Sequence, residues 1–170
     1  MRIDPSTTQR AVRLIHRAVL GEEDDIAAEG FAAIHRWRDL AKKKTLEQWP
    51  DALKEIAITI TATRREPALH RALWLLIQVC SENELRREDM ERLAESLDAL
   101  FTETSYDVWN TRDPLTNART VSLTIVRAQC VRLAHEMQKG GITHNSIDSW
   151  LAVADRDPIP EVRYALEPID

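Results

Sequence analysis

Scarcity of glycine is the feature that most restricts what this chain can fold into. Only 4 of its 170 residues are glycine, whereas about 12 would be expected at average usage. Phosphate-binding loops, tight β-hairpins and dinucleotide-binding folds need glycine where the backbone turns sharply or approaches a ligand. The shortage therefore disfavours these architectures, and the many alanines and leucines favour helices.

The N-terminal third contains clear helix signals. Asp4-Pro5 combines a capping residue with the residue favoured at the first helical position, and Gly21 is a natural terminator. The acidic run 22–25 favours the start of a second helix. Apolar residues then recur at spacings of three and four, which predicts one buried stripe: Ile26, Gly30, Ala33, Ile34, Trp37 and Ala41.

Residues 56–63 have two interpretations. They alternate like a strand and are rich in β-branched side chains. However, no second strand is evident to pair with them, and an isolated strand leaves its backbone groups without partners. Leu53, Ile56 and Ile60 also share one helix face, so we predict a helix here. Its start is expected at the capping box of residues 45–48 and Pro50.

The remaining segments predict further helices. One opens at Pro67, and a second carries a stripe from Met90 to Phe101 before a loop at residues 104–112. A long helix after Asp113-Pro114 ends at Gly140-Gly141, and Ser146 is expected to cap the next one. The inward positions expected for the Pro67 helix and the long helix are Leu69, Leu73, Leu76, Ile77, Cys80, and Leu115, Ala118, Ser122, Ile125, Val126, Cys130, Leu133, Met137.

These signals predict an all-α chain of about eight antiparallel helices in a single domain, residues 1–170, because short connections make neighbouring helices antiparallel. Prolines that open helices recur at intervals of 45, 47 and 46 residues (5 to 50, 67 to 114, 114 to 160). Helical-pair repeats have periods of about 40–47 residues. An irregular helical bundle with one proline-rich turn is the alternative.

The segment Asp157-Pro158-Ile159-Pro160-Glu161-Val162-Arg163 follows Trp150–Ala154, and together they resemble the inter-helix turn of a HEAT repeat. The resemblance is confined to about residues 148–166, and it implies an α–α superhelix. The chain ends about one turn into its last helix, whereas solenoids normally end in a polar cap. We therefore expect either a frayed C-terminus or one piece of a larger helical protein.

No motif for chemistry is present. The sequence lacks a Walker A loop, GxGxxG, GxSxG and HExxH, and its five histidines are scattered over five predicted elements. Cys80 and Cys130 lie in apolar runs without metal-ligand spacing, so we expect two buried free thiols. The sequence thus predicts no enzyme, no cofactor, no metal and no small-molecule substrate.

Charge is unevenly distributed although the net charge is only −5. Residues 36–71 hold nine Lys or Arg against five acids, and residues 82–103 hold three against eight. The basic residues singled out as a candidate interaction surface are Lys42, Lys43, Lys44, Arg64, Arg65 and Arg71. Favourable placement at helix C-termini explains most of them equally well, and the acidic balance makes nucleic acid an improbable partner.

Five tryptophans stand beside only two phenylalanines and two tyrosines. Trp37 and Trp150 lie on predicted core stripes, whereas Tyr106 and Trp109 fall in the expected loop. Loop aromatics either cover the core or anchor an interface. Tyr106 and Trp109 are therefore candidate interaction residues.

The sequence thus predicts a scaffold that presents a rigid helical surface to another protein or to itself. Two alternatives stay open: an immunity-type protein that masks a toxin or nuclease, and a nucleic-acid-binding repeat that uses residues 36–71. The longest apolar run, Ala72 to Ile77, is far shorter than the roughly 20 residues of a membrane span. The N-terminus lacks a signal-peptide core, so we expect a cytoplasmic protein.

Overall fold

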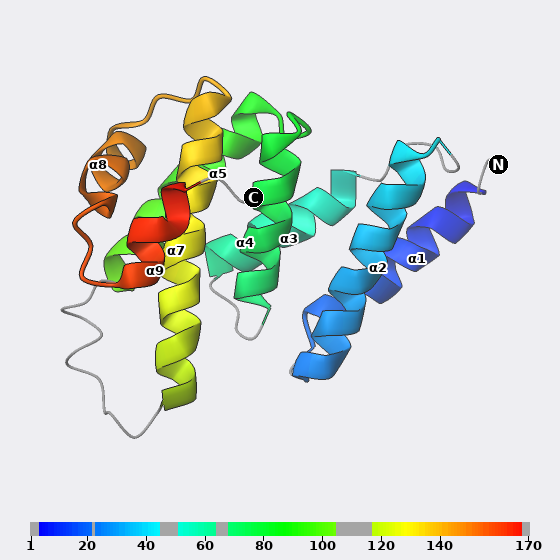
Figure 1. The fold of residues 1–170 in the computed structure, drawn as a ribbon. Coiled ribbons are helices and arrows are strands. Elements are labelled where there is room, and N and C mark those ends of the chain that lie inside the picture. The colour runs from blue at the N-terminus through cyan, green and yellow to red at the C-terminus, as the bar shows by residue number, and fades with distance from the viewer. Residues whose placement is uncertain (1–3, 22, 45–50, 64–67, 105–116, 168–170) are drawn as a thin grey trace. The chain divides into compact units, whose positions relative to one another are not determined.

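The computed structural model describes residues 4–21, 23–44, 51–63, 68–104 and 117–167, with the side chains of residues 63 and 117–123 excepted. These residues form helices and no strand, which confirms the predicted all-α class (Figure 1). The α-helices are α1 (Pro5–Val19), α2 (Asp24–Lys42), α3 (Asp51–Thr63), α4 (Leu69–Ser81), α5 (Arg87–Glu103), α7 (Asn117–Lys139), α8 (Asn145–Ala154) and α9 (Pro160–Arg163), and a 3-10 turn η1 (Tyr164–Leu166) follows.

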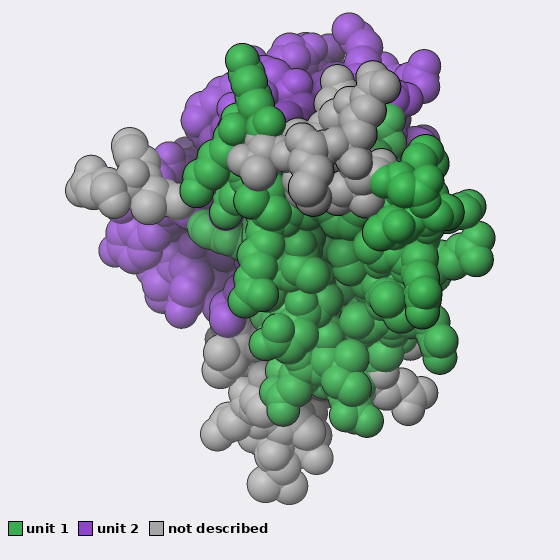
Figure 2. All heavy atoms as spheres, turned by 90° about the vertical axis from the view of Figure 1, so that its right-hand side faces the viewer, with its two compact units in different colours: residues 1–75 green, residues 76–170 purple. Residues whose placement is uncertain are grey.

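The chain divides within α4 into two compact units, Met1–Leu75 (unit 1) and Leu76–Asp170 (unit 2), which are coloured separately in Figure 2. In unit 1, α1 packs along α2 and also touches α3. In unit 2, the long helix α7 packs against α5, α8, α9 and η1. The single domain and the HEAT-like repeat stay predictions.

Residues 51–63 are helical, which confirms the choice of helix over strand. Leu53, Ile56 and Ile60 are all buried. Thr61 is buried too, and its hydroxyl donates to the carbonyl oxygen of Ala57 at 3.0 Å. A β-branched sequence is therefore compatible with this helix because its apolar face is covered and the buried Thr61 hydroxyl is bonded.

The predicted start of α1 and the predicted end of α7 are confirmed. At the start of α1, the Thr7 N–H donates to the Asp4 carboxylate at 3.3 Å. After α7, Gly141 takes a φ of +82°, and the Ile142 N–H donates to the Met137 carbonyl at 3.1 Å. This hydrogen-bond pattern is a Schellman motif, in which glycine supplies the left-handed residue.

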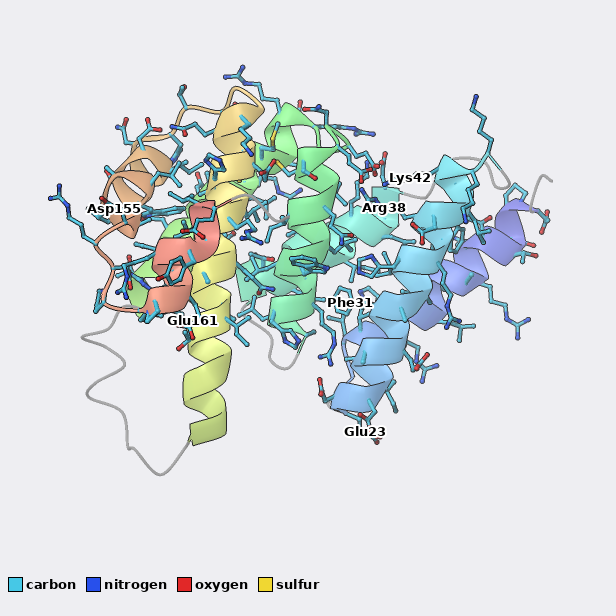
Figure 3. All side chains as sticks on the ribbon, in the orientation of Figure 1. Glu23, Phe31, Arg38, Lys42, Asp155 and Glu161 are labelled. Atoms are coloured by element: carbon cyan, nitrogen blue, oxygen red, sulfur yellow. The ribbon has the colours of Figure 1, made fainter. Side chains whose placement is uncertain are left out.

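The predicted core stripe of α2 is confirmed at Gly30 and Ile34 but not at its other positions. The buried residues are Ala27, Gly30, Phe31, Ile34 and Arg38. Ile26 is instead 45% exposed and Trp37 is half-buried. The three- and four-residue spacing identified a real apolar stripe, but α2 has two overlapping stripes. The buried stripe is the one centred on Phe31 and Ile34. Figure 3 marks Glu23 and Lys42 near the ends of α2, with Phe31 and Arg38 between them.

Two predictions for residues of unit 2, Ile125 and Ser146, are wrong. Ile125 was expected inside but is 41% exposed, whereas Val126, Cys130, Leu133 and Met137 of the same helix are buried. Ser146 does not cap α8, because the capping residue is His144, whose Nδ1 accepts from the Ser146 N–H at 3.3 Å.

Several predicted features lie outside the described residues. They are the capping box at 45–48 with Pro50, the helix start at Pro67, the start at Asp113-Pro114, and the expected loop apart from Thr104. Cys80 and Cys130 are buried and form no disulfide, as predicted. No helix in the described part of the chain combines the length and the apolar composition needed to cross a membrane.

Candidate interaction surface

Helices α1 and α2 approach each other closely at Gly30. A Cβ at this position would lie 2.6 Å from Val19 Cγ1 and 3.1 Å from the Val19 nitrogen, so any larger side chain would push the helices apart. Ala18 and Ala33 are also small residues where the helices meet. The small side chains leave a shallow groove above this seam.

Two adjoining hollows of about 410 and 270 Å³ make up this groove, and Ala33 lines both. We call it the α1–α2 groove. Its lining residues are Thr7, Thr8, Ala11, Leu14, Ile15 and Ala18 from α1, and Asp25, Ile26, Glu29, Gly30, Ala33, Arg36, Trp37 and Leu40 from α2. Both helices belong to unit 1, which is green in Figure 2.

Large apolar side chains are exposed along the groove. Leu14 is 59% exposed, Ile26 is 45% exposed and Leu40 is 40% exposed. The other exposed large apolar residues of the described chain are single side chains on four separate elements: Trp74, Ile125, Val153 and Tyr164. Because isolated apolar residues are normal on a protein surface but a gathered patch is not, the α1–α2 groove is the strongest candidate site.

The two edges of the groove carry opposite charges. Arg13 and Arg17 are exposed and flank Leu14 on α1, and Asp25 and Glu29 are exposed and flank Ile26 on α2. None of these four forms an ion pair with another described residue. The neighbouring Asp24, in contrast, forms an ion pair with Arg71, whose Nη1 lies 2.5 Å from the Asp24 Oδ1. The groove therefore has a basic edge beside Leu14 and an acidic edge beside Ile26, and exposed Arg36 adds a cation further along α2.

A further hollow of about 450 Å³ lies between α1 and α3. Its walls combine apolar Val12 and Ile56 with Arg13, Arg17 and Glu55. The cations and the carboxylate share one opening, and the described polar residues that line it are exposed rather than buried in the way that small-molecule sites require. We therefore assign it no ligand.

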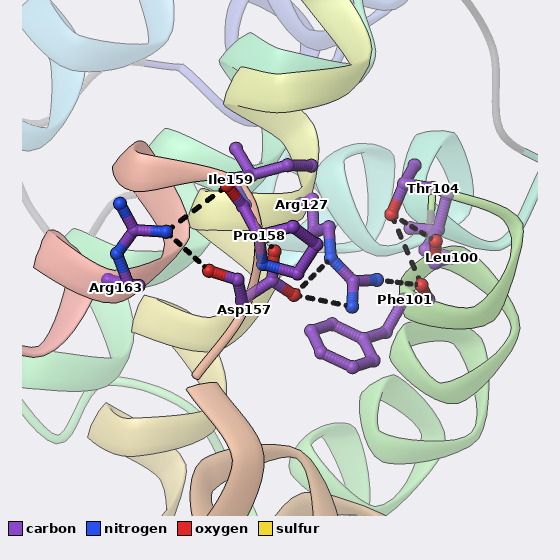
Figure 4. Close-up of polar contacts among 8 residues, drawn as sticks. All are labelled: Leu100, Phe101, Thr104, Arg127, Asp157, Pro158, Ile159 and Arg163. Atoms are coloured by element: carbon purple, nitrogen blue, oxygen red, sulfur yellow. Dashed lines mark hydrogen bonds and ion pairs between the residues drawn. The ribbon is translucent and has the colours of Figure 1, made fainter. Parts of the chain in front are cut away.

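Unit 2 contains a buried polar cluster centred on Arg127 (Figure 4). The Arg127 guanidinium donates to the Asp157 carboxylate from Nε at 2.8 Å and from Nη2 at 2.7 Å. It also donates to the Phe101 carbonyl and lies 3.7 Å from the centre of the Phe101 ring. The Phe101 ring stacks on Trp150, whose indole N–H donates to Asp98 at 3.2 Å.

Asp157 completes this cluster from the turn between α8 and α9. Its second carboxylate oxygen accepts from the Ile159 N–H at 2.9 Å, and its own carbonyl accepts from Arg163 at 2.7 Å. Both side chains of the Arg127–Asp157 pair are under 10% exposed. Each charged group is therefore already bonded within the chain, and the cluster joins α5, α7 and the α8–α9 turn rather than facing a ligand.

The residues singled out from the sequence are not brought together. Lys42, Lys43 and Lys44 are exposed at the end of α2, where cations complement the helix dipole. Arg71 is engaged with Asp24. Arg38 and Lys54, two further cations of the basic region, are respectively 4% exposed and paired with Asp51 at 2.7 Å. Arg64, Arg65, Tyr106 and Trp109 lie outside the described residues.

Sequence reasoning missed the residues that form the groove. Leu14 was not singled out in the sequence, and Ile26 and Trp37 were assigned to the core. One signal could have found them: α2 has more apolar positions than a single helix face can bury, which implies a second covered face.

No group of three or more histidine, cysteine or acidic side chains in the described ranges is arranged to hold a metal ion. The chain matches no family model, no curated protein and no solved structure.

Proposed function

We propose that this chain is a non-enzymatic protein-interaction module whose α1–α2 groove receives a helical partner. One observation carries the proposal: three large apolar side chains, Leu14, Ile26 and Leu40, are exposed along a single groove between two packed helices. Amphipathic helices bind in apolar grooves of this kind through anchors spaced three, four and seven residues apart.

Burial of the exposed apolar side chains would contribute to docking. Full burial of one leucine or isoleucine side chain contributes about 1.5–3 kcal/mol. Because Leu14, Ile26 and Leu40 are already about half covered, a partner must bring apolar anchors of its own to offset the entropy loss of association. Trp37 adds a half-buried aromatic side chain to the floor of the groove. Aromatic residues in partly enclosed positions are common binding hot spots.

The charged edges define the chemistry of the partner. A helix that fits must carry an apolar stripe flanked by acidic residues opposite Arg13 and Arg17, and by basic residues opposite Asp25 and Glu29. Such complementary charges select the partner and its orientation more than they add affinity. A protein helix meets these requirements, whereas a uniformly acidic nucleic acid would be repelled by the acidic edge.

Photo-crosslinking inside the source cell tests this function. A photoreactive phenylalanine analogue replaces Leu14 or Leu40, and a third variant carries it at exposed Glu95 in α5 as the control. We expect both groove positions to crosslink to one and the same polypeptide, within an amphipathic helix identified by mass spectrometry. Absence of adducts at both groove positions, or equal adducts at position 95, would overturn the proposal.

A further inference from the structure

We infer that the α1–α2 groove receives an amphipathic helix that is basic where it passes Ile26 and acidic along the rest of its length, past Leu14 and Leu40. This inference rests on the proposed function and names the charge order of the partner. The observation that carries it is a change of charge along the groove, from carboxylates at one end to exposed cations on both helices at the other.

The contact at Gly30 shows which residues of the two helices lie at the same level. Helices α1 and α2 pack together across a short connection, so they run antiparallel. A Cβ on Gly30 would meet Ala18 and Val19. At a rise of about 1.5 Å per residue, Leu14 lies about 6 Å from this contact in one direction and Ile26 about 6 Å in the other. The levels along the groove are therefore, in order, Ile26, then Gly30 with Ala18, then Ala33 with Leu14, then Trp37 with Ala11, and last Leu40 with Thr7 and Thr8.

The end of the groove at Ile26 is acidic. Asp25 and Glu29 are exposed, and they line the first hollow together with Ile26. By the same count of residues from the contact, Arg17 of α1 comes only after Glu29 on moving along the groove away from Ile26. The partner therefore meets two carboxylates at this end, and basic residues complement them.

The rest of the groove has cations on both edges. On α1, Arg10 and Arg13 precede Leu14 and lie on its outer flank, opposite the buried residues of that helix. On α2, Arg36 lines the second hollow, and Lys43 follows two turns later on the same flank. All four cations are exposed. A helix that passes this stretch needs acidic residues on both of its flanks.

Two acidic residues near this stretch do not change its sign. Asp39 lies about 100° round α2 from Leu40, on the side away from α1. The Asp4 carboxylate caps α1 and accepts from the Thr7 N–H at 3.3 Å. Even with both carboxylates counted, the four cations leave this part of the groove positive.

The two hollows set the spacing of the partner's apolar anchors. Gly30 lines the first hollow, of about 410 Å³, and Trp37 lines the second, of about 270 Å³. These two residues are two helical turns apart on α2, which corresponds to about 10 Å along the groove. A helix presents residues i and i+7 on one face at the same separation. The partner therefore places one large apolar side chain in each hollow and its charged residues on the flanks.

The charge order disfavours two other kinds of ligand. A uniformly basic helix would be repelled along most of the groove by the cations of both edges. A uniformly acidic chain, including nucleic acid, would be repelled by Asp25 and Glu29 at the Ile26 end. A helix with both signs in the inferred order meets opposite charges at each end.

Three synthetic peptides test this charge order on the full chain. Each is a helix of about 18 residues, long enough to span the groove, and all have leucine at the same positions, spaced three, four and seven residues apart. The matched peptide has lysine beside its first leucine and glutamate beside the others. The second peptide has glutamate at all these flanking positions, and the third has lysine at all of them. Fluorescence anisotropy measures the affinity of each labelled peptide.

We expect the matched peptide to bind about tenfold more tightly than the lysine peptide, with the glutamate peptide between them. The paired substitution Asp25→Lys, Glu29→Lys should make the glutamate peptide bind more tightly than the matched one. The paired substitution Arg13→Glu, Arg36→Glu should abolish the preference for the matched peptide over the lysine peptide. All four positions are exposed, and circular dichroism checks that the variants stay helical.

The control variant carries Arg87→Glu and Arg156→Glu, at two exposed positions of unit 2, and should leave the order of the three peptides unchanged. A lysine peptide that binds as tightly as the matched one, or a control variant that changes the order as much as the groove variants, would overturn the inference. So would an absence of binding by all three peptides at about 100 µM, or displacement of the matched peptide by single-stranded DNA.

The proposed function fails separately. Peptides that bind alike, and that Leu14→Ala or Leu40→Ala weakens alike, keep the groove as an interaction site and remove only the charge order. An absence of crosslinks at positions 14 and 40 in the cell removes the proposed function itself.

Discussion

At the scale of single residues, the buried Arg127–Asp157 pair defines how unit 2 is held together. The Arg127 guanidinium reaches the Phe101 carbonyl on α5 and the Asp157 carboxylate on the α8–α9 turn. Breaking a buried pair by removing one partner is costly because the other charge stays in a low-dielectric environment without compensation. Arg127 should therefore matter more to stability than any exposed arginine.

Arg127→Ala should lower the free energy of unfolding by about 3–5 kcal/mol. Urea denaturation followed by circular dichroism measures the change. Arg156→Ala is the matched control, since Arg156 is 86% exposed and lies 3.9 Å from Asp155, and it should change stability by less than about 0.5 kcal/mol. Equal effects of the two substitutions would show that the buried pair does not stabilise the fold.

At the scale of whole helices, α2 shows that sequence patterns can predict a helix and its ends without predicting which face is buried. Its helical character and its ends followed from the acidic first turn and the closing lysines. Its buried face did not, because Ile26, Ala33 and Trp37 form one stripe while Ala27, Phe31 and Ile34 form another. Only the position of α1 decides which stripe belongs to the core, and spacing along one helix contains no information about its neighbour.

Gly30 is where the two helices depend on each other most closely. Gly30→Ala should lower the free energy of unfolding by about 1–3 kcal/mol, because the new methyl group would overlap Val19 in a well-packed seam. This direction opposes the helix propensity of alanine, which alone would add up to about 1 kcal/mol. Thermal unfolding followed by circular dichroism measures the balance.

Gly140→Ala is the control for this prediction. A Cβ there has its nearest neighbour at 3.3 Å instead of 2.6 Å, so the substitution should be tolerated better. The double variant Gly30→Ala, Val19→Ala should recover part of the lost free energy of unfolding, because it removes the Val19 Cγ1 that the new methyl group would meet. A stabilised Gly30→Ala variant would mean that α1 and α2 are not packed as closely as the structure shows.

At the scale of the whole molecule, the sequence allowed the class to be predicted but not the site. Few glycines, repeated proline helix starts and Gly140-Gly141 were sufficient for an all-α chain. The candidate surface was predicted from charge runs and loop aromatics, because these features can be recognised in the linear sequence. The groove depends on which side chains two helices leave uncovered, and Leu14 and Ile26 look like ordinary core residues in the sequence.

We predict that another protein covers the α1–α2 groove inside the cell, and the reactivity of a thiol introduced in the groove tests this most directly. The native thiols give little background, because burial raises the pKa of Cys80 to about 11 and that of Cys130 to about 12. At neutral pH both therefore hold very little of the reactive thiolate. A cysteine at position 14 or at exposed position 95 would dominate labelling by a maleimide.

The measurement compares Leu14→Cys with Glu95→Cys, each labelled inside the source cell and again as dilute purified protein. We predict that position 14 reacts severalfold more slowly in the cell than in dilution, while position 95 reacts equally in both. If position 14 reacts as fast in the cell as in dilution, the groove is open to solvent and the claim is contradicted.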